Sequence, residues 1–281
     1  SPEVKFWAGN FLYSQQKYPE AEALYKEAID SQQYVPGLAS ALASIRFQQR
    51  RYAEAVTLAK MDLAKDPNWM LANEVAGLSL MKLHRYGEAV KPLALTFART
   101  PFKSVIDVEY AQALYWQGDY VNALRPALIY LALTADLFAN NEPAKVVLGR
   151  ILRHVNERDL ATRIDEVNKV FGLERSAAFH FSLGDVLDKY GFRGLAIEQY
   201  KQGLALQPQF GRGLYRLGVD LEIYKHNYPE ALKYLEEAAA LLPEDEAIQK
   251  HVLRLQDRWA TYKTDWSWRL KDWLQKSCRN S

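Results

Sequence analysis

The sequence predicts an all-α solenoid of antiparallel helix pairs, and three observations support this fold class. Tyrosines recur every 34 residues, at Tyr18, Tyr52, Tyr86 and Tyr120. An alanine follows each of them three residues later, at Ala21, Ala55, Ala89 and Ala123. Between these points apolar residues recur at steps of three and four, which is helical periodicity, and no sustained alternation indicates strands. A fixed period of this length is typical of stacked helical repeats.

The repeat continues over most of the chain. Three looser units centre on Ala161, Ala196 and Ala231, so the sequence predicts about seven repeats over residues 1–246. The register slips between the fourth and fifth units, and we expect a longer connection at residues 135–143.

Small residues mark where the paired helices should meet. One lies twelve positions before each alanine, except that the last is one residue out of step; the set is Gly9, Ala43, Gly77, Ala111, Gly149, Gly184 and Gly218. Antiparallel helices approach closely only where side chains are short, and one such point is needed on each helix. Prolines near the unit ends should stop the second helices.

This pattern resembles the tetratricopeptide repeat family over roughly residues 3–246. That family has small residues at the eighth and twentieth positions of a 34-residue helix–turn–helix, an aromatic near the seventeenth and a proline near the thirty-second. Gln33 and Arg158 depart from the pattern. The resemblance implies a right-handed α–α superhelix whose first helices line a concave groove, where peptides commonly lie.

The resemblance also supplies candidate groove residues. They combine aromatic, adaptable, amide and basic side chains on the first helices: Asn10, Tyr13, Phe47, Leu78, Met81, Gln112, Tyr115, Trp116, Arg150, Arg153, Arg212 and Arg216. We expect the ligand surface to centre on the third to fifth units. The alternative, that several of these rings pack on neighbouring helices, stays open. Of the carboxylate clamp found in heat-shock co-chaperones the first three units match only Asn10, although Arg212 and Arg216 copy its last pair.

Residues 247–281 depart from the repeat and carry four of the seven tryptophans. Their apolar residues draw one long helical stripe, which fits a C-terminal capping helix with a Trp-rich tail, since a terminal repeat needs a cover. We expect Trp259 to be buried in that cap. A second hypothesis is that Trp266, Trp268 and Trp273 dock a partner or another copy of the chain.

Composition excludes several function classes. With 36 basic and 34 acidic residues the net charge is +2, which gives no general attraction to nucleic acid. No apolar run approaches the ~20 residues of a transmembrane helix. The five histidines are scattered and the one cysteine, Cys278, lies in the tail, so no metal site, cofactor or covalent nucleophile is predicted.

The sequence therefore predicts a non-catalytic scaffold or adaptor that binds a protein or peptide in its groove. Two alternatives remain: a structural subunit of a bacterial envelope or secretion assembly, and the regulatory arm of an enzyme whose catalytic part is elsewhere. Because the sequence begins at Ser1, we expect a processed chain or a fragment of a longer one. The compartment is left open between cytoplasm and bacterial periplasm.

Overall fold

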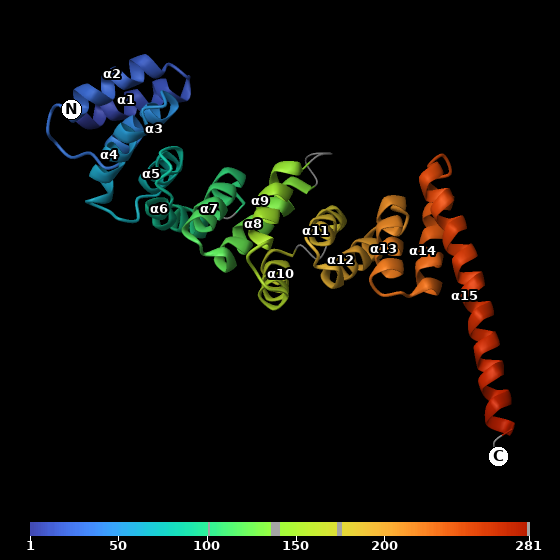
Figure 1. Cartoon of the computed structure of the whole chain (residues 1–281). Helices are drawn as coiled ribbons and strands as arrows, with labels where there is room; N and C mark the ends of the chain where they lie inside the picture. Colours follow the sequence, from blue (N-terminus) through green and yellow to red (C-terminus); the bar gives the residue numbers. More distant parts are fainter. Residues whose placement is uncertain (101, 136–140, 173–175, 280–281) are drawn as a thin grey trace. The chain divides into compact units, whose positions relative to one another are not determined.

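The computed structural model describes residues 1–100, 102–135, 141–172 and 176–279, and the described residues form fifteen helices and no strand (Figure 1). Consecutive helices form antiparallel pairs, which confirms the predicted all-α repeat fold. The helices are α1 Pro2–Ser14, α2 Tyr18–Ile29, α3 Leu38–Gln48, α4 Tyr52–Leu63, α5 Met70–Lys82, α6 Tyr86–Arg99, α7 Ser104–Gln117, α8 Tyr120–Ala135, α9 Glu142–Leu152, α10 Glu157–Phe171, α11 Ala177–Lys189, α12 Arg193–Leu206, α13 Gly211–Ile223, α14 Tyr228–Leu241 and α15 Glu246–Arg279.

The chain divides into two compact units, Ser1–Val167 and Asn168–Ser281. The first unit begins with the pairs α1–α2, α3–α4, α5–α6 and α7–α8, and the second contains α11–α12, α13–α14 and α15. The boundary between the units falls inside α10. Most of the predicted long connection at 135–143 lies outside the described residues. None of the described helices is both long and apolar enough to span a bilayer.

The turns inside the first four helix pairs share one backbone conformation. A residue just after the first helix adopts a positive φ, at Gln16 (62°), Arg50 (60°), His84 (57°) and Gly118 (86°), which are again 34 residues apart. The amide of the next residue then bonds back to a carbonyl five residues earlier, as from Arg51 N to Arg46 O (2.8 Å). This is the Schellman arrangement, which satisfies the free carbonyls at the end of a helix. A residue in left-handed conformation therefore ends each of these first helices.

The predicted small residues do lie at close contacts between paired helices. A Cβ added to Gly9 would lie 2.5 Å from the Tyr25 ring, and one added to Gly77 would lie 2.8 Å from Leu93. Where the first helix has Ala43 instead, the residue sixteen positions later is Ala59, and both are fully buried. Glycine thus faces a large side chain while alanine faces alanine, which keeps the helices close in either case.

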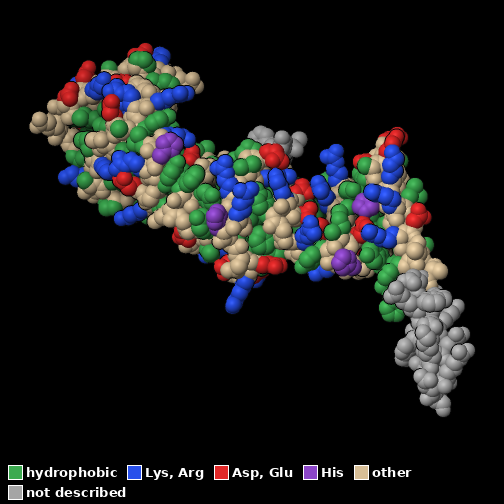
Figure 2. Space-filling view, in the orientation of Figure 1, with side chains coloured by type: hydrophobic (Ala, Val, Ile, Leu, Met, Phe, Trp, Pro, Cys, Tyr) green, Lys and Arg blue, Asp and Glu red, His purple; other side chains and the backbone are tan. Residues whose placement is uncertain are grey.

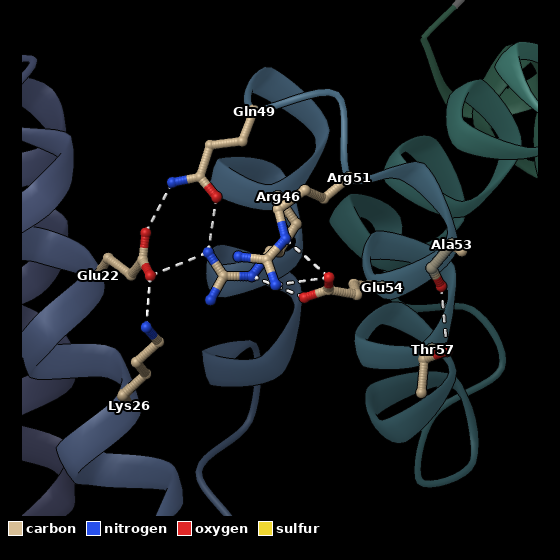
Figure 3. Close-up of polar contacts among 8 residues, drawn as sticks. All are labelled: Glu22, Lys26, Arg46, Gln49, Arg51, Ala53, Glu54 and Thr57. Atoms are coloured by element: carbon tan, nitrogen blue, oxygen red, sulfur yellow. Dashed lines mark hydrogen bonds and ion pairs between the residues drawn. The ribbon is translucent and has the colours of Figure 1, made fainter.

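Arg46 links two repeats through one buried guanidinium (Figure 3). Its Nη1 lies 3.0 Å from Glu22 Oε1 on α2, and its Nε lies 3.2 Å from Glu54 Oε2 on α4. Nη1 also donates to Gln49 Oε1 (2.7 Å), and Gln49 in turn donates to Glu22 (2.7 Å). The network therefore ties α2, α3 and α4 together at one edge of the stack.

In the second unit, α15 packs on α14 through its first turns. Ile248, Val252 and Leu255 are buried there. Trp259 was expected to be buried, but it is only half-buried, and its ring stacks on Tyr262 (5.5 Å between centroids). The Trp259 ring also contacts Tyr228 at the start of α14 (5.8 Å between centroids), so α14 covers only part of it.

Candidate functional site: a groove on the first helices

A cavity of about 570 Å³ opens along the first helices of the first three repeats. Helix α1 contributes Phe6 and Asn10, α3 contributes Ala41, and α5 contributes Leu71 and Glu74. The remaining lining comes from Gly37 just before α3, from Asp66, Asn68 and Trp69 in the connection before α5, from Met70 at the start of α5 and from Arg99 at the end of α6. Because these first helices lie side by side, one cavity crosses three repeats.

Trp69 forms an apolar wall of the cavity from the connection between α4 and α5. Its ring lies against Gly37, where an added Cβ would come within 2.7 Å of Trp69 Cζ2. Gly37 also has a φ of +83°, a conformation that side chains disfavour. Among the described residues the buried Nε1 of Trp69 has no hydrogen-bond acceptor. Packing therefore holds the indole ring in place, and its N–H group has no acceptor among the described residues.

Polar groups at the cavity are fixed by neighbouring contacts. The Tyr25 hydroxyl donates to Asn10 Oδ1 (2.6 Å), which orients the amide so that its nitrogen remains a donor. The Arg99 guanidinium donates through Nη1 to the Asn68 carbonyl (2.8 Å). Lys103 Nζ forms an ion pair with Glu74 Oε1 (2.5 Å). The cavity thus combines an apolar wall with a few oriented donors, which is the usual composition of a small binding site.

This chemistry suits binding and offers no catalytic constellation. Aromatic and aliphatic side chains can cover an apolar group, while Asn10 and Arg99 can donate to carbonyl or carboxylate oxygens. In the part of the chain that the structure describes, no three His, Cys, Asp or Glu side chains are arranged to hold a metal ion.

Asn10 lines this cavity, and so do Phe6 and Glu74, two further groove positions that the family resemblance indicates. Three other candidates form an aromatic pair with the tyrosine five residues later. The pairs are Tyr13–Tyr18 (5.2 Å), Phe47–Tyr52 (5.5 Å) and Tyr115–Tyr120 (5.6 Å). These half-buried rings help to close the turn inside their own repeats, so packing accounts for much of their surface.

Leu78 and Met81 do not offer the groove surface that the sequence indicated. Both are buried, with exposed fractions of 8% and 5%. Every residue from Ala72 to Leu80 except Glu74 is buried, because α5 is packed on several sides by α4, α6 and its flanking first helices. Gln112 on α7 is half-buried.

Trp116 is the most open of the aromatic groove candidates, with 54% of its surface exposed. Its ring stacks on Tyr86 of the preceding repeat, with 5.4 Å between centroids. The same relation recurs one repeat later, where Tyr120 stacks on His154 at 4.2 Å. Rings of adjacent repeats therefore form a partly exposed aromatic row beside the turns.

The basic candidates are exposed. Arg150 lies on α9 and Arg153 follows it directly, in a region where Figure 2 shows several Lys and Arg side chains. Arg212 and Arg216 lie on α13 in the second unit, and Arg216 Nε is 3.9 Å from Asp185 Oδ1. Neither pair lies at the cavity.

Of the tail candidates, Trp266 is 55% exposed on α15. The side chains of Trp268 and Trp273 lie outside the described part of the structure. Neighbouring Tyr262 is also exposed (45%).

Sequence reasoning missed the residues that the inter-repeat connection contributes, chiefly Trp69. A tryptophan just after Pro67, between two helices, was the available indication. The family resemblance assigns groove positions on helices only. Trp69 lies in a loop, and the conformation of that loop brings its ring to the cavity.

With the helix pairs and their spacing established, the match to a known family decides the identification. Residues 8–68 match the family model described as tetratricopeptide repeat. Residues 8–68 carry tetratricopeptide repeats. Such repeats typically mediate binding to proteins or peptides. The match spans the first two repeats, and the 34-residue register extends the same unit along the first compact unit.

Solved structures of tetratricopeptide proteins are similar at low identity. One from Parabacteroides merdae is 13% identical, with 90% of this chain and 98% of that chain covered and a TM-score of 0.42. YrrB, described as having an unusual peptide-binding site, is 17% identical, with 82% and 97% covered and a TM-score of 0.38. The yeast Sti1 TPR2AB domain in complex with pHSP90 is 14% identical, with 90% and 96% covered and a TM-score of 0.35. No curated protein matches the chain.

Proposed function

We propose that this protein is a non-catalytic scaffold that holds a segment of a partner protein in the cavity on α1, α3 and α5. The observation that carries the proposal is the cavity of about 570 Å³, which three successive repeats line with their first helices. A surface of this kind can follow an extended chain from one repeat to the next.

The lining favours a peptide with a large apolar side chain. Phe6, Leu71 and Trp69 can cover that side chain, and the removal of apolar surface from water is the main source of affinity. The nitrogen of the Asn10 amide can donate to carbonyl oxygens of the peptide backbone. Glu74 is already paired with Lys103, so a strongly basic peptide gains little at this position.

The test begins with peptides selected from a random display library on the wild-type chain. Leu71→Glu places a charge on the cavity wall at a residue that is 38% exposed, so the fold should tolerate it. We expect selected peptides to bind at least tenfold more weakly, a loss of about 1.4 kcal/mol or more. Asn10→Ala should weaken the same peptides.

The matched control is Trp116→Glu, at an exposed ring outside the cavity lining. Titration by fluorescence anisotropy should give the control wild-type affinity. Equal binding by Leu71→Glu and the wild type would place the ligand surface elsewhere, for instance at the third to fifth repeats.

A second candidate function, a structural subunit that assembles through its tail, is favoured by the exposure of Tyr262 and Trp266 on α15. Removal of residues 265–281 should then lower the mass seen by light scattering at an unchanged melting temperature. A truncated chain with unchanged assembly and an unfolded last repeat would identify the tail as a lid only.

A further inference from the structure

An exposed apolar surface adjoins the cavity at the start of α7. Phe102, just before this helix, and Val105, in its first turn, are 47% and 52% exposed. Val105 follows the cavity residue Leu71 by 34 residues, so the two occupy the same position on α7 and α5. Lys103 lies between the two exposed residues and forms an ion pair with the cavity residue Glu74 (2.5 Å). This contact places the apolar surface directly beside the cavity.

The backbone at Phe102 adopts a conformation that bulky side chains avoid. Its φ is 76°, in the left-handed region. Among the described residues the other non-glycine residues with a positive φ are all polar: Gln16, Gln32, Arg50, His84 and His226. A large apolar side chain that is half exposed gains little from burial at this position. Strain of this kind at an exposed aromatic residue points to a function outside the fold itself.

The connection before α5 presents an aromatic residue in the same way. Trp69 precedes α5 and lines the cavity together with Leu71 in the first turn of that helix. Phe102 precedes α7 and is followed by Val105 in its first turn. Each site therefore pairs an aromatic ring from a connection with an aliphatic side chain from a first helix. The cavity is the first apolar subsite, and Phe102 with Val105 forms the second subsite.

The spacing of the two subsites selects a ligand conformation. Helices α5 and α7 are neighbours with Cα atoms no more than 8 Å apart at their closest, and the axes of packed helices lie about 8–10 Å apart. A polyproline II chain has three residues per turn and rises about 3.1 Å per residue, so side chains three residues apart lie on one side, about 9 Å apart. Side chains on one face of a strand are about 7 Å or about 13 Å apart, which fits less well.

The polar group between the subsites disfavours a helical ligand. Residues seven apart on a helix would also span about 10 Å. However, the residues three or four along lie on the same face and would meet the Lys103–Glu74 ion pair. In a polyproline II chain the intervening side chains point elsewhere. Its carbonyls make no internal hydrogen bonds, so they are available to the Asn10 amide nitrogen.

We propose that the two subsites together bind a proline-rich segment of the partner in polyproline II conformation, with large apolar side chains three residues apart. The inference rests on the proposed function, because the first of these side chains occupies the cavity. The second packs on Phe102 and Val105, which gives the strained ring its use. Aromatic-lined grooves suit such segments, because a preformed polyproline II chain loses little entropy on binding.

Two fluorescent peptides provide the test. Both carry two leucines in a proline host, three residues apart in one peptide and two residues apart in the other. Fluorescence anisotropy with the whole chain should show at least fivefold tighter binding of the peptide with the three-residue spacing. Val105→Glu should weaken this peptide at least tenfold and remove the preference for its spacing. The control is Val170→Glu, the same substitution at an exposed valine (63%) of the second compact unit, which should bind as the wild type does.

Phe102→Asn distinguishes a binding role from a structural one. Asparagine tolerates the left-handed conformation, so the melting temperature should equal or exceed that of the wild type. The peptide with the three-residue spacing should nevertheless bind at least fivefold more weakly. A lower melting temperature with unchanged peptide binding would assign Phe102 to the fold alone and overturn the inference.

Leu71→Glu separates this inference from the proposal on the cavity, because it should weaken both peptides. Equal affinities for the two spacings, or wild-type binding by Val105→Glu, would overturn the second subsite. The cavity proposal would still stand if Leu71→Glu weakened the peptides selected by display. Failure of both leucine peptides to bind at several millimolar would overturn the polyproline II ligand, whereas the display-selected peptides would decide on the cavity separately.

Discussion

Arg46 Nη1 lies 3.0 Å from Glu22 Oε1, and this pair connects the second helix of the first repeat to the first helix of the second. Only 5% of the Arg46 side chain and 14% of the Glu22 side chain are exposed. Removal of one member of a buried ion pair leaves the other charge buried without its partner. This loss lowers the free energy of unfolding by more than the intact pair adds to it. The relationship therefore makes this edge of the stack sensitive to single substitutions.

The first prediction is that Arg46→Met lowers the free energy of unfolding by about 1–3 kcal/mol, because Glu22 and Glu54 both lose a hydrogen-bonded cation. Denaturant titration followed by circular dichroism measures this. Arg51→Met is the control, since Arg51 is half exposed and pairs with Glu54 at the surface. It should cost less than about 1 kcal/mol. Equal losses in the two variants would contradict the special role of Arg46.

The second prediction concerns acid. Burial alone would raise the pKa of Glu22, but hydrogen bonds from Lys26, Gln49 and Arg46 outweigh it and lower that pKa to about 2. A lowered pKa adds stability that is present above pH 4.5 and is lost as the pH falls towards 2. The difference in unfolding free energy between the wild type and Glu22→Gln should therefore shrink over this interval. A difference that stays constant from pH 6 to pH 2 would show that Glu22 has no lowered pKa.

The third prediction concerns Asp107 on α7, which is fully buried and has no hydrogen-bond partner for either carboxyl oxygen among the described residues. Desolvation raises its pKa to about 7. Because the folded state prefers the protonated acid, the contribution of this residue becomes less favourable as the pH rises from about 4 to 7.

Asn73, 34 residues earlier, shows how an amide fits at the same register: its Nδ2 donates to the carbonyls of Pro67 (2.9 Å) and Trp69 (3.0 Å). Asp107→Asn should therefore raise the unfolding free energy at pH 8 by about 1–3 kcal/mol, with a smaller gain at pH 4. Melting temperatures at the two pH values test this. A variant less stable than the wild type at pH 8 would contradict the assignment.

The fourth prediction uses the left-handed turns. Arg50 has a φ of 60° and is exposed, so Arg50→Gly removes the strain of a side chain in this conformation and should stabilise the chain by up to about 1 kcal/mol. Gly118→Ala is the reciprocal change, at a φ of 86° with no atom within 4 Å of the added Cβ. It should destabilise by about 1 kcal/mol through the backbone alone. Shifts of the same sign in both variants would contradict the shared turn.

The sequence by itself determined the helix pairs. The spacing of Gly9, Gly77 and Ala89 and the 34-residue step of the tyrosines could be read as contact points, because only short side chains let two helices approach closely. All three small residues are buried as expected. This kind of inference works because helical periodicity states which side of each helix faces another.

Only the tertiary structure decided which surfaces stay open. Met81 is 5% exposed whereas Tyr115, at the same position of the next repeat, is half-buried, because exposure depends on the neighbouring helices. Trp69 reaches the cavity through the path of a loop, which has no period to read. Trp7 is exposed although its equivalent Ala41 is buried, since no helix of the described structure stacks on the outer face of α1. The sequence of a repeat therefore specifies its own helix pair, while the surface that each repeat leaves exposed depends on the helices that pack against it.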